Sequence, residues 1–406
     1  MPFVMARRQD APSTRRLLAT GALALVLAAG CNHFEPLDLT ARSPDSRGYK
    51  VEAPIPPRIP GSVRFFAVGD AGEPDRDHPG HINDAAQQVA SRVGAVCKAK
   101  GGCDFGVFLG DNIYRTGIGS LDPNEKSQLH FRDFVAAYTS ALGDGKFPLF
   151  FVLGNHDWGP SFVGYGAAPT TARADRELES VARCLNCRGA AHFYDVVAGP
   201  VHLFAWDTNY LVHQCDELAT NCELTGSEKL DGPRHSKATW RLVLGHHPYF
   251  SNGEHGDAGT FREGSGFAVW PGKGFRKLMD DHVLGVADLY LAGHDHNLQA
   301  YPDATIHRGR VPGRNRTAVV VSGAGSKLTA LREIPTHIAP SDYACDTHLG
   351  FALVEASAEL LRVEFYDVPP AALAAPVFRM TKRKGHASFE VEGKPACRPA
   401  EPPPKR

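Results

Sequence analysis

The sequence has no surplus of charge of either sign. Its 44 Lys and Arg residues are matched by 45 Asp and Glu residues, which leaves a net charge of −1 with histidine neutral. A protein that binds nucleic acid through the phosphate backbone needs a basic surface, so this balance argues against nucleic acid as a partner. With 43% hydrophobic and 22% charged residues, the chain also lacks the composition of a disordered, collagen-like or coiled-coil protein.

A membrane-spanning run is missing at the N-terminus as well. The apolar stretch at 17–29 has 13 residues, which is too short to cross a bilayer as a helix. It follows four arginines and ends in small residues directly before Cys31, a pattern similar to a bacterial lipoprotein cleavage site. This similarity predicts removal of residues 1–30, a lipid on Cys31 and anchoring to a membrane that faces the periplasm or the cell surface.

Two alternatives remain for this leader. The pair Arg15-Arg16 is also typical of the twin-arginine route, which exports folded proteins, and an ordinary secretory signal with a chance cysteine would leave a periplasmic or secreted protein. All three interpretations predict export. Residues 31–60, rich in proline and without periodicity, are expected to form an extended tether.

The nine cysteines are an odd number, which a lipidated Cys31 would explain because it leaves eight. Disulfides form in the oxidising compartments that exported proteins enter. The alternative is a zinc site at Cys184 and Cys187, but no second Cys-x-x-Cys accompanies it. We therefore predict four bonds: Cys97–Cys103, Cys184–Cys187, Cys215–Cys222 and Cys345–Cys397.

One local pattern occurs five times along the chain: a short apolar run, then glycine, then a residue that can bind a metal. The runs end before Asp70, Asp111, Asn155, His246 and His294. Continuous apolar runs are typical of buried strands, and functional sites of α/β proteins lie at the carboxyl ends of such strands. We expect these five side chains to meet at one site.

Helical spacing at 81–100 and 125–142 and later strands complete the pattern. Those later strands are expected at 201–206, 318–323, 350–356 and 360–367. The order predicts an α/β fold of two mixed β-sheets packed as a sandwich and flanked by helices. We place this domain at 61–368, followed at 369–406 by a proline-rich, basic C-terminal tail.

The strand-end motifs resemble those of purple acid phosphatases of the tartrate-resistant type, within the calcineurin-like metallophosphoesterase superfamily. The stretches 110–117 and 246–256 are the most similar. The most specific feature is Tyr114 combined with Asp70-Ala71-Gly72, because most of the superfamily has a histidine at the third position of that motif and no such tyrosine. A hard phenolate ligand favours Fe(III) over a divalent ion.

The resemblance implies two metal sites that share Asp111. Fe(III) would be bound by Asp70, Asp111, Tyr114 and His296. A divalent metal, Fe(II), Zn or Mn, would be bound by Asp111, Asn155, His246 and His294. Small phosphate esters would be the substrates, and the implied reaction is hydrolysis of phosphomonoesters at acidic pH, with a metal-activated hydroxide attacking phosphorus in line.

The resemblance also implies proton donors. His156 would hydrogen-bond the phosphate or protonate the leaving group, and His255 and Glu254 match the family's active-site acids, although a solvated loop is the alternative for both. Asp157 and Asp295 are either supports for neighbouring imidazoles or surface turn residues.

The sequence departs from the family at Trp158, which replaces a common histidine and is expected to reshape the substrate mouth. It departs also at 212–238, where a cysteine-containing segment replaces a regular helix. Two other functions therefore stay open: a phosphodiesterase or nucleotidase of the wider superfamily, and a non-catalytic surface lipoprotein. The sequence does not predict the oligomeric state.

Overall fold

The computed structural model describes residues 48–161, 164–165, 171–214, 227–261, 272–305, 316–332, 341–368, 375–393 and 397. All of them belong to one compact unit, residues 36–406. The leader, Cys31 and the Cys215–Cys222 pair lie outside the described residues. Among the helices that are described, none combines the length and the hydropathy of a membrane span.

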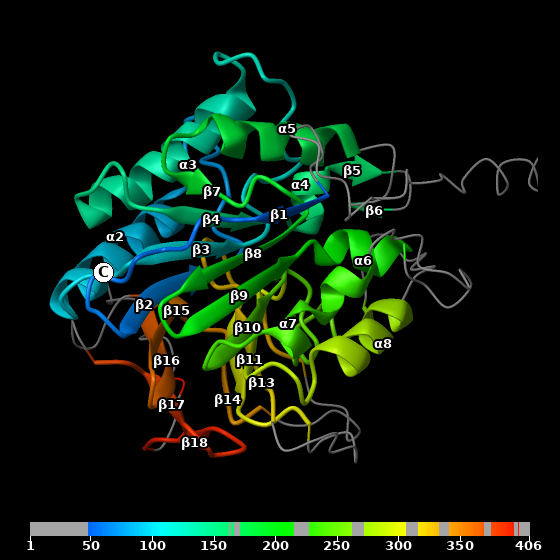
Figure 1. Cartoon of the computed structure of the whole chain (residues 1–406). Coiled ribbons are helices and arrows are strands. Elements are labelled where there is room, and N and C mark those ends of the chain that lie inside the picture. The colour runs from blue at the N-terminus through cyan, green and yellow to red at the C-terminus, as the bar shows by residue number, and fades with distance from the viewer. Residues whose placement is uncertain are drawn as a thin grey trace, which may run out of the picture. The chain divides into compact units, whose positions relative to one another are not determined.

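Two mixed eight-stranded sheets form the centre of this unit, as Figure 1 shows. Sheet I has the order β1 (Tyr49–Val51), β8 (Phe193–Ala198), β9 (Val201–Trp206), β10 (Trp240–Leu244), β11 (Leu289–Ala292), β13 (Ala318–Ser322), β12 (Leu298–Tyr301) and β14 (Tyr343–Cys345). Sheet II has the order β18 (Glu390–Val391), β17 (Phe378–Arg383), β16 (Leu360–Val368), β15 (Leu349–Ser357), β2 (Ser62–Val68), β3 (Phe105–Leu109), β4 (Leu149–Val152) and β7 (Cys187–Arg188). A separate small hairpin joins β5 (Pro160–Ser161) to β6 (Gly164–Tyr165).

The sheets pack face to face through one cluster of buried apolar side chains contributed by both. Phe65 and Phe105, on neighbouring strands of sheet II, stack with ring centroids 4.7 Å apart, and Leu203 and Leu291 of sheet I join the same cluster. Such apolar runs, buried on both faces, need layers on both sides, which is why the strands contain few polar residues. The predicted sandwich of two mixed sheets is confirmed.

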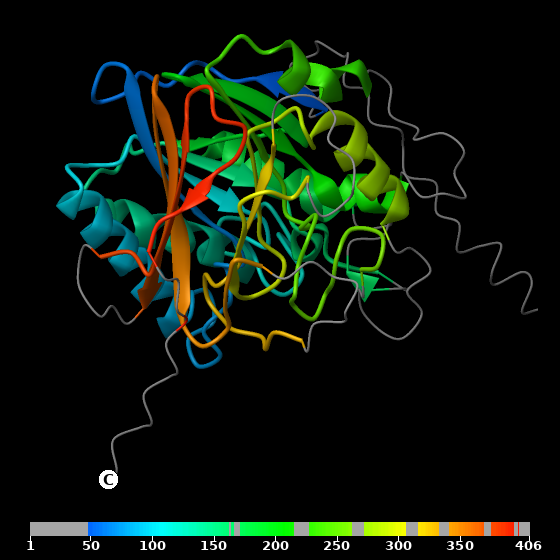
Figure 2. The same cartoon turned by 90° about the horizontal axis from the view of Figure 1, so that it is seen from below.

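Helices cover the outer faces of the sandwich. On sheet II lie α2 (Asp84–Ala99), α3 (Lys126–Leu142) and α5 (Thr171–Arg183), whose apolar residues share a second core cluster with that sheet. On the side of sheet I lie α6 (Thr208–Gln214), η1 (Ser227–Asp231), α7 (Gly232–His235) and α8 (Lys273–His282). Figures 1 and 2 show α2 and α8 on opposite sides of the strands. Asn83 caps α2, since its side chain accepts the N–H of Ala86 at 2.8 Å.

The expected domain limits of 61 and 368 do not coincide with the ends of the sheets. Strand β1 lies in the segment expected as a tether and pairs in parallel with β8. Strand β17 lies in the segment expected as a tail and pairs with β16, and its residues Phe378 and Met380 are buried in the central core. The proline content of both segments hid these strands, although β1 lies at a sheet edge and β17 itself contains no proline.

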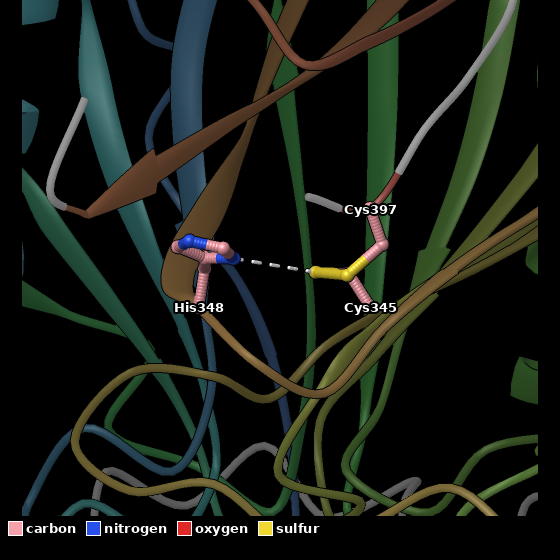
Figure 3. A group of neighbouring side chains, drawn as sticks. All are labelled: Cys345, His348 and Cys397. Atoms are coloured by element: carbon pink, nitrogen blue, oxygen red, sulfur yellow. Dashed lines mark hydrogen bonds between the residues drawn. A yellow bond between two sulfur atoms is a disulfide. The ribbon is translucent and has the colours of Figure 1, made fainter. Parts of the chain in front are cut away.

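Three of the predicted disulfides are confirmed: Cys97–Cys103, Cys184–Cys187 and Cys345–Cys397. The alternative of a zinc site at Cys184 and Cys187 is therefore wrong. Figure 3 shows the third bond, which ties Cys397 of the C-terminal segment to the end of β14, with the ring of His348 beside the sulfur atoms. The Nδ1 atom of His348 lies 3.9 Å from Sγ of Cys345.

Candidate metal centre

The expected ligands meet where the two sheets end together. Asp70 and Asp111 each follow the end of their strand, β2 and β3, after one glycine. Asn155 opens the short helix α4 (Asn155–Trp158) after β4. These three strands are parallel neighbours, so their carboxyl ends share one edge. His246 and His294 follow β10 and β11, which are parallel neighbours in sheet I. Both sheets thus contribute to one cluster.

Close backbone approach makes this meeting possible. A Cβ atom added to Gly69 would lie 2.9 Å from Cα of Gly293, and one added to Gly154 would lie 2.3 Å from the backbone nitrogen of Asp111. Larger residues at these strand ends would force the two sheets and the ligand loops apart. Glycine permits this close approach because it carries no Cβ atom.

Three of the candidate ligands have left-handed backbone conformations, with φ of 57° at Asp70, 53° at Asp111 and 71° at His294. For residues that carry a Cβ, this conformation costs about 1 kcal/mol each. Such strain collects at functional sites, where the surrounding structure holds it. It aims the three side chains into the same space.

Asp70, Tyr114 and His296 form one half of the cluster. The hydroxyl of Tyr114 donates to Oδ1 of Asp70 at 2.9 Å and lies 3.3 Å from Nε2 of His296. The Nε2 atom of His296 is 3.5 Å from the same carboxylate oxygen. All three side chains are buried, so a phenol, a carboxylate and an imidazole converge without solvent around them.

Asp111, Asn155, His246 and His294 form the other half. The Nδ1 atom of His246 lies 2.8 Å from the carbonyl oxygen of Leu109, which can only accept, so Nδ1 carries the ring proton. In the neutral ring, which is the form that binds metals, the Nε2 atom offers a lone pair. That lone pair lies 3.0 Å from Oδ1 of Asn155 and 3.4 Å from Oδ1 of Asp111, which are both acceptors.

His294 closes this half, with its Nδ1 atom 3.2 Å from Nε2 of His246. Its remaining ring nitrogen, Nε2, is buried and has no hydrogen-bond partner among the described residues. Burial, followed by the charges of His255 and His247, lowers the pKa of His294 well below its ordinary value. A neutral imidazole is the form that binds metals.

Asp111 and Tyr114 differ in protonation in the metal-free protein. Burial raises the pKa of Asp111, but the charges of His246 and His156 outweigh it and lower that pKa below its usual range, so the carboxylate is ionised. Burial, then the charges of Asp111 and Asp70, raises the pKa of Tyr114 well above its ordinary value. The metal-free protein therefore holds a protonated phenol beside anionic carboxylates.

This donor set fits a pair of cations. Ligand atoms of Asp70, Asp111 and His246 lie within 4.8 Å of one another. Buried lone pairs that face each other repel unless a proton or a cation lies between them. The mixture of carboxylates, one phenol, one amide and imidazoles suits iron together with a borderline divalent metal.

The expected proton donors surround this cluster. The ring of His156 lies 4.4 Å from that of Tyr114, and its Nδ1 atom donates to the carbonyl oxygen of Arg115 at 2.8 Å. The ring of His255 lies 4.3 Å from that of His294 on the other side. Glu254 is more exposed, with its Oε1 atom 3.8 Å from Nε2 of His255. The structure brings all three near the cluster.

Asp157 and Asp295 are buried rather than surface turn residues. Asp157 accepts the backbone N–H groups of Asn112 and Ile113, both at 2.9 Å, and that of Gly154 at 2.8 Å. Asp295 accepts the N–H of His255 at 3.0 Å. These carboxylates hold backbone groups of the loops that carry Asp111, Asn155 and His255, whereas the support interpretation had expected contacts to imidazole rings.

Several supporting residues were missed from the sequence. The hydroxyl of Thr208, at the start of α6, accepts the backbone N–H groups of His246 and His247 at 3.0 and 2.9 Å. Ser251 donates to Asp295, and Glu177 of α5 accepts from Asn112 at 3.0 Å. Thr208 follows the predicted strand 201–206, so its place at a strand end was the available signal. This strand end lacks the glycine that marks the five strand ends of the repeated pattern.

The expectation for Trp158 is wrong. Its side chain is fully buried and its Nε1 atom donates to Asp207 at 3.1 Å. Its ring lies 5.4 Å from that of His192, so it packs in the core rather than at a substrate mouth. A large indole with a single polar atom is more stable in a core that supplies an acceptor.

Comparison with known sequences gives a consistent result. The family model for calcineurin-like phosphoesterases matches residues 63–298. Purple acid phosphatase 3 of Arabidopsis thaliana is 30% identical over 338 residues, which cover 77% of this chain and 76% of that protein. Tartrate-resistant acid phosphatase type 5 of Homo sapiens is 27% identical over 327 residues, covering 75% and 87%.

Solved structures show the same fold at lower identity. GAP50, described as the anchor in the inner membrane complex of Plasmodium, superposes with a TM-score of 0.53 at 18% identity, over 82% of this chain and 90% of that one. A purple acid phosphatase from yellow lupin (Lupinus luteus) seeds gives 0.51 at 15% identity, over 77% and 52%.

Proposed function

The chain belongs to the calcineurin-like phosphoesterase family, within its purple acid phosphatase group, and we propose that it hydrolyses phosphomonoesters at acidic pH at a centre of Fe(III) and a divalent metal. That it is a hydrolase of phosphoesters follows from the family. The preference for monoesters and for acidic pH is proposed from relatives named as acid phosphatases.

The observation that carries the proposal is the buried contact between His246 and Asn155 beside Asp111. Two acceptor atoms, Nε2 of His246 and Oδ1 of Asn155, lie 3.0 Å apart in a buried site, with the ionised Asp111 beside them. A metal cation between these atoms would satisfy all three. A neutral amide and neutral imidazoles, together with one shared carboxylate, leave such an ion divalent.

Tyr114 supports a trivalent ion in the other half. Its phenol, 2.9 Å from Asp70, keeps its proton in the metal-free protein because its pKa is raised. Replacing that proton takes a strongly charged, hard cation, and Fe(III) has this property. We propose Asp70, Asp111, Tyr114 and His296 for Fe(III), and Asp111, Asn155, His246 and His294 for Fe(II), Zn or Mn.

When bound, such a pair of metals lowers the pKa of water and offsets charge on the phosphoryl group. The protein's own residues do the rest. His156 hydrogen-bonds a phosphoryl oxygen, and its orientation is fixed by the contact of Nδ1 with the Arg115 carbonyl oxygen. His255 delivers a proton to the leaving alcohol. Asp295 accepts its backbone N–H, and the carboxylate of Glu254 lies beside its ring.

Metal analysis of the chain without residues 1–30, followed by assays on phosphomonoesters and phosphodiesters, tests this function. We expect about two metal ions per chain, one of them iron, and faster hydrolysis of monoesters below neutral pH. Asp111→Asn is expected to abolish hydrolysis and lower metal content. Faster cleavage of diesters or nucleotides by two divalent ions would favour the wider superfamily, and binding without turnover would favour a non-catalytic lipoprotein.

We also propose that the protein is exported, with residues 1–30 removed, a lipid on Cys31, and residues 32–47 leading to the domain. The three disulfides support an oxidising compartment. Mass spectrometry of the membrane fraction tests this: a mature N-terminus at Cys31 carrying acyl chains is expected, and an unmodified cysteine in a soluble fraction would overturn it.

A further inference from the structure

A cavity of about 850 Å³ opens beside the candidate metal centre. Tyr114 and His156 of the centre form part of its wall. Three cationic side chains, Arg76, Arg115 and Lys327, line the same cavity. A group attached to a phosphate held at His156 would extend into this space, so its wall is in a position to select the leaving alcohol.

Lys327 is held against the centre. Its Nζ atom lies 3.4 Å from the centroid of the Tyr114 ring and 3.1 Å from Oε2 of Glu73. The segment before it is also fixed, because Ser326 donates to the backbone oxygen of Asp70 and a Cβ on Gly325 would lie 2.3 Å from the backbone oxygen of Gly69. The ammonium group is therefore preorganised next to a candidate metal ligand.

Glu73 also reaches the second cation, since its Oε1 atom lies 3.9 Å from a guanidinium nitrogen of Arg115. One carboxylate thus stands between two positive groups at the end of the cavity nearest Tyr114 and His156. Among Glu73, Lys327 and Arg115, one positive charge is left unbalanced. The two cationic side chains are accessible to a ligand, because 29% of Lys327 and 61% of Arg115 is exposed.

The other carboxylates of the wall, Asp75, Asp77 and Asp84, do not cancel this charge at close range. Asp75 accepts the backbone N–H groups of Asp77 and His78 at 2.8 and 3.2 Å and contacts the His78 ring at 3.0 Å. Asp84 lies in the first turn of α2, where the helix dipole favours a negative charge. Asp77 is exposed, and Arg76, exposed beside it, makes no ion pair within the described ranges.

We propose that Lys327, with Arg115, binds a second anionic group on the alcohol of the substrate, so that the enzyme prefers phosphomonoesters whose leaving group carries another negative charge. This inference rests on the proposed function. A second phosphate and a carboxylate share the required chemistry, which is an oxyanion that accepts charge-assisted hydrogen bonds from ammonium and guanidinium groups. Lys327 is a specificity residue in this assignment.

Ratios of kcat/KM on matched substrates test the proposal with the metal-loaded protein. Glycerol phosphate has a neutral alcohol, phosphoglycerate adds a carboxylate, and glycerol bisphosphate adds a second phosphate. Wild type is expected to favour one or both charged substrates over glycerol phosphate. Lys327→Met is expected to lower that ratio about tenfold, since hydrogen bonds to charged groups contribute about 1.5–3 kcal/mol.

Matched variants separate charge from structure. Lys327→Arg keeps the charge and is expected to keep the preference. Lys146→Met makes the same chemical change on an exposed lysine. Lys146 lies just before the start of β4, whereas the site lies at the carboxyl ends of the strands, so the ratio is expected to stay unchanged. Glu73→Gln removes the ion pair of Lys327 but keeps the lysine. It is therefore expected to change the ratio of kcat/KM values without a substitution at residue 327.

The two levels of inference fail differently. No hydrolysis of glycerol phosphate by the metal-loaded wild type would contradict the proposed function itself. Hydrolysis of glycerol phosphate with equal ratios in wild type and Lys327→Met would overturn the anionic subsite alone. The two charged substrates distinguish a carboxylate from a phosphate as the group that is recognised.

Discussion

The hydroxyl of Tyr114 donates a hydrogen bond of 2.9 Å to Oδ1 of Asp70. Because the pKa of this phenol is raised by burial and by neighbouring carboxylates, the bond belongs to the metal-free state. In the proposed centre, iron would replace this proton, and both side chains would then serve as its ligands.

Tyr114→Phe is therefore expected to remove the visible absorption band that iron loading produces in wild type, since that band needs a phenolate ligand. Iron titration followed by absorption spectroscopy measures this. Tyr138→Phe is the matched control: Tyr138 is equally buried, and its hydroxyl has no partner among the described residues. A colourless wild type that retains iron would contradict the tyrosine ligand.

Asp157→Ala is expected to destabilise the fold by about 3 kcal/mol, because it leaves three buried backbone N–H groups without an acceptor. The same change loosens the loops of Asp111 and Asn155, so metal content is expected to fall. Urea unfolding and metal analysis measure the two effects. The exposed Asp144→Ala, with a change within about 0.5 kcal/mol, is the control.

His192 makes stability depend on pH in the alkaline range. Burial lowers its pKa, but hydrogen bonds to Asp175 and Asp207 outweigh burial and raise the pKa to about 9. A folded-state pKa above the unfolded value stabilises the fold fully below about pH 6.5, and this stabilisation is lost as the pH rises through 9.

The free energy of unfolding of wild type is accordingly expected to fall by about 3 kcal/mol between neutral pH and pH 9–10 from this group. His192→Gln is expected to flatten that fall. Equal slopes for wild type and variant in urea unfolding across this range would show that the pair with Asp207 does not hold a proton.

Cys397→Ser is expected to cost about 4 kcal/mol of stability, as estimated from closure of the loop between Cys345 and Cys397. The lost bond releases the segment that follows β18, so limited proteolysis is expected to cut the C-terminal segment first. Wild type treated with reductant should behave alike, whereas Cys397→Ser resistant to protease would show that β17 alone holds this segment.

The meeting of these five side chains was predictable from the sequence because the candidate ligands follow one rule. Asp70, Asp111, Asn155, His246 and His294 each stand at a strand end after glycine, and parallel neighbouring strands bring such ends together. Tyr114 and His296 required the family resemblance, since nothing in local spacing sets them apart.

The support around the ligands was not predictable in this way. Thr208 and Glu177 act through contacts between segments far apart in the chain, and single residues of these types are common on any surface. Trp158 was placed at the mouth because it stands beside the ligand motif. Sequence proximity to a site does not fix direction, and its indole points into the core.

Lys327 illustrates the same limit on the other side of the centre. It follows β13 without any motif, and only the fold brings it to Glu73, which lies far away in sequence. Substrate selection by such residues is therefore a property of the tertiary structure.

Beyond their shared core, the two sheets meet at the candidate metal centre and at one covalent link. Sheet I supplies His246 and His294 and sheet II supplies Asp70 and Asp111, while the Cys345–Cys397 bond joins the last strand of sheet I to the segment beyond the last strand of sheet II. A slip of one sheet along the other by a single residue, about 3.3 Å, would break the ligand set at one end and strain the covalent link at the other. Shear between the layers is thus opposed at both places.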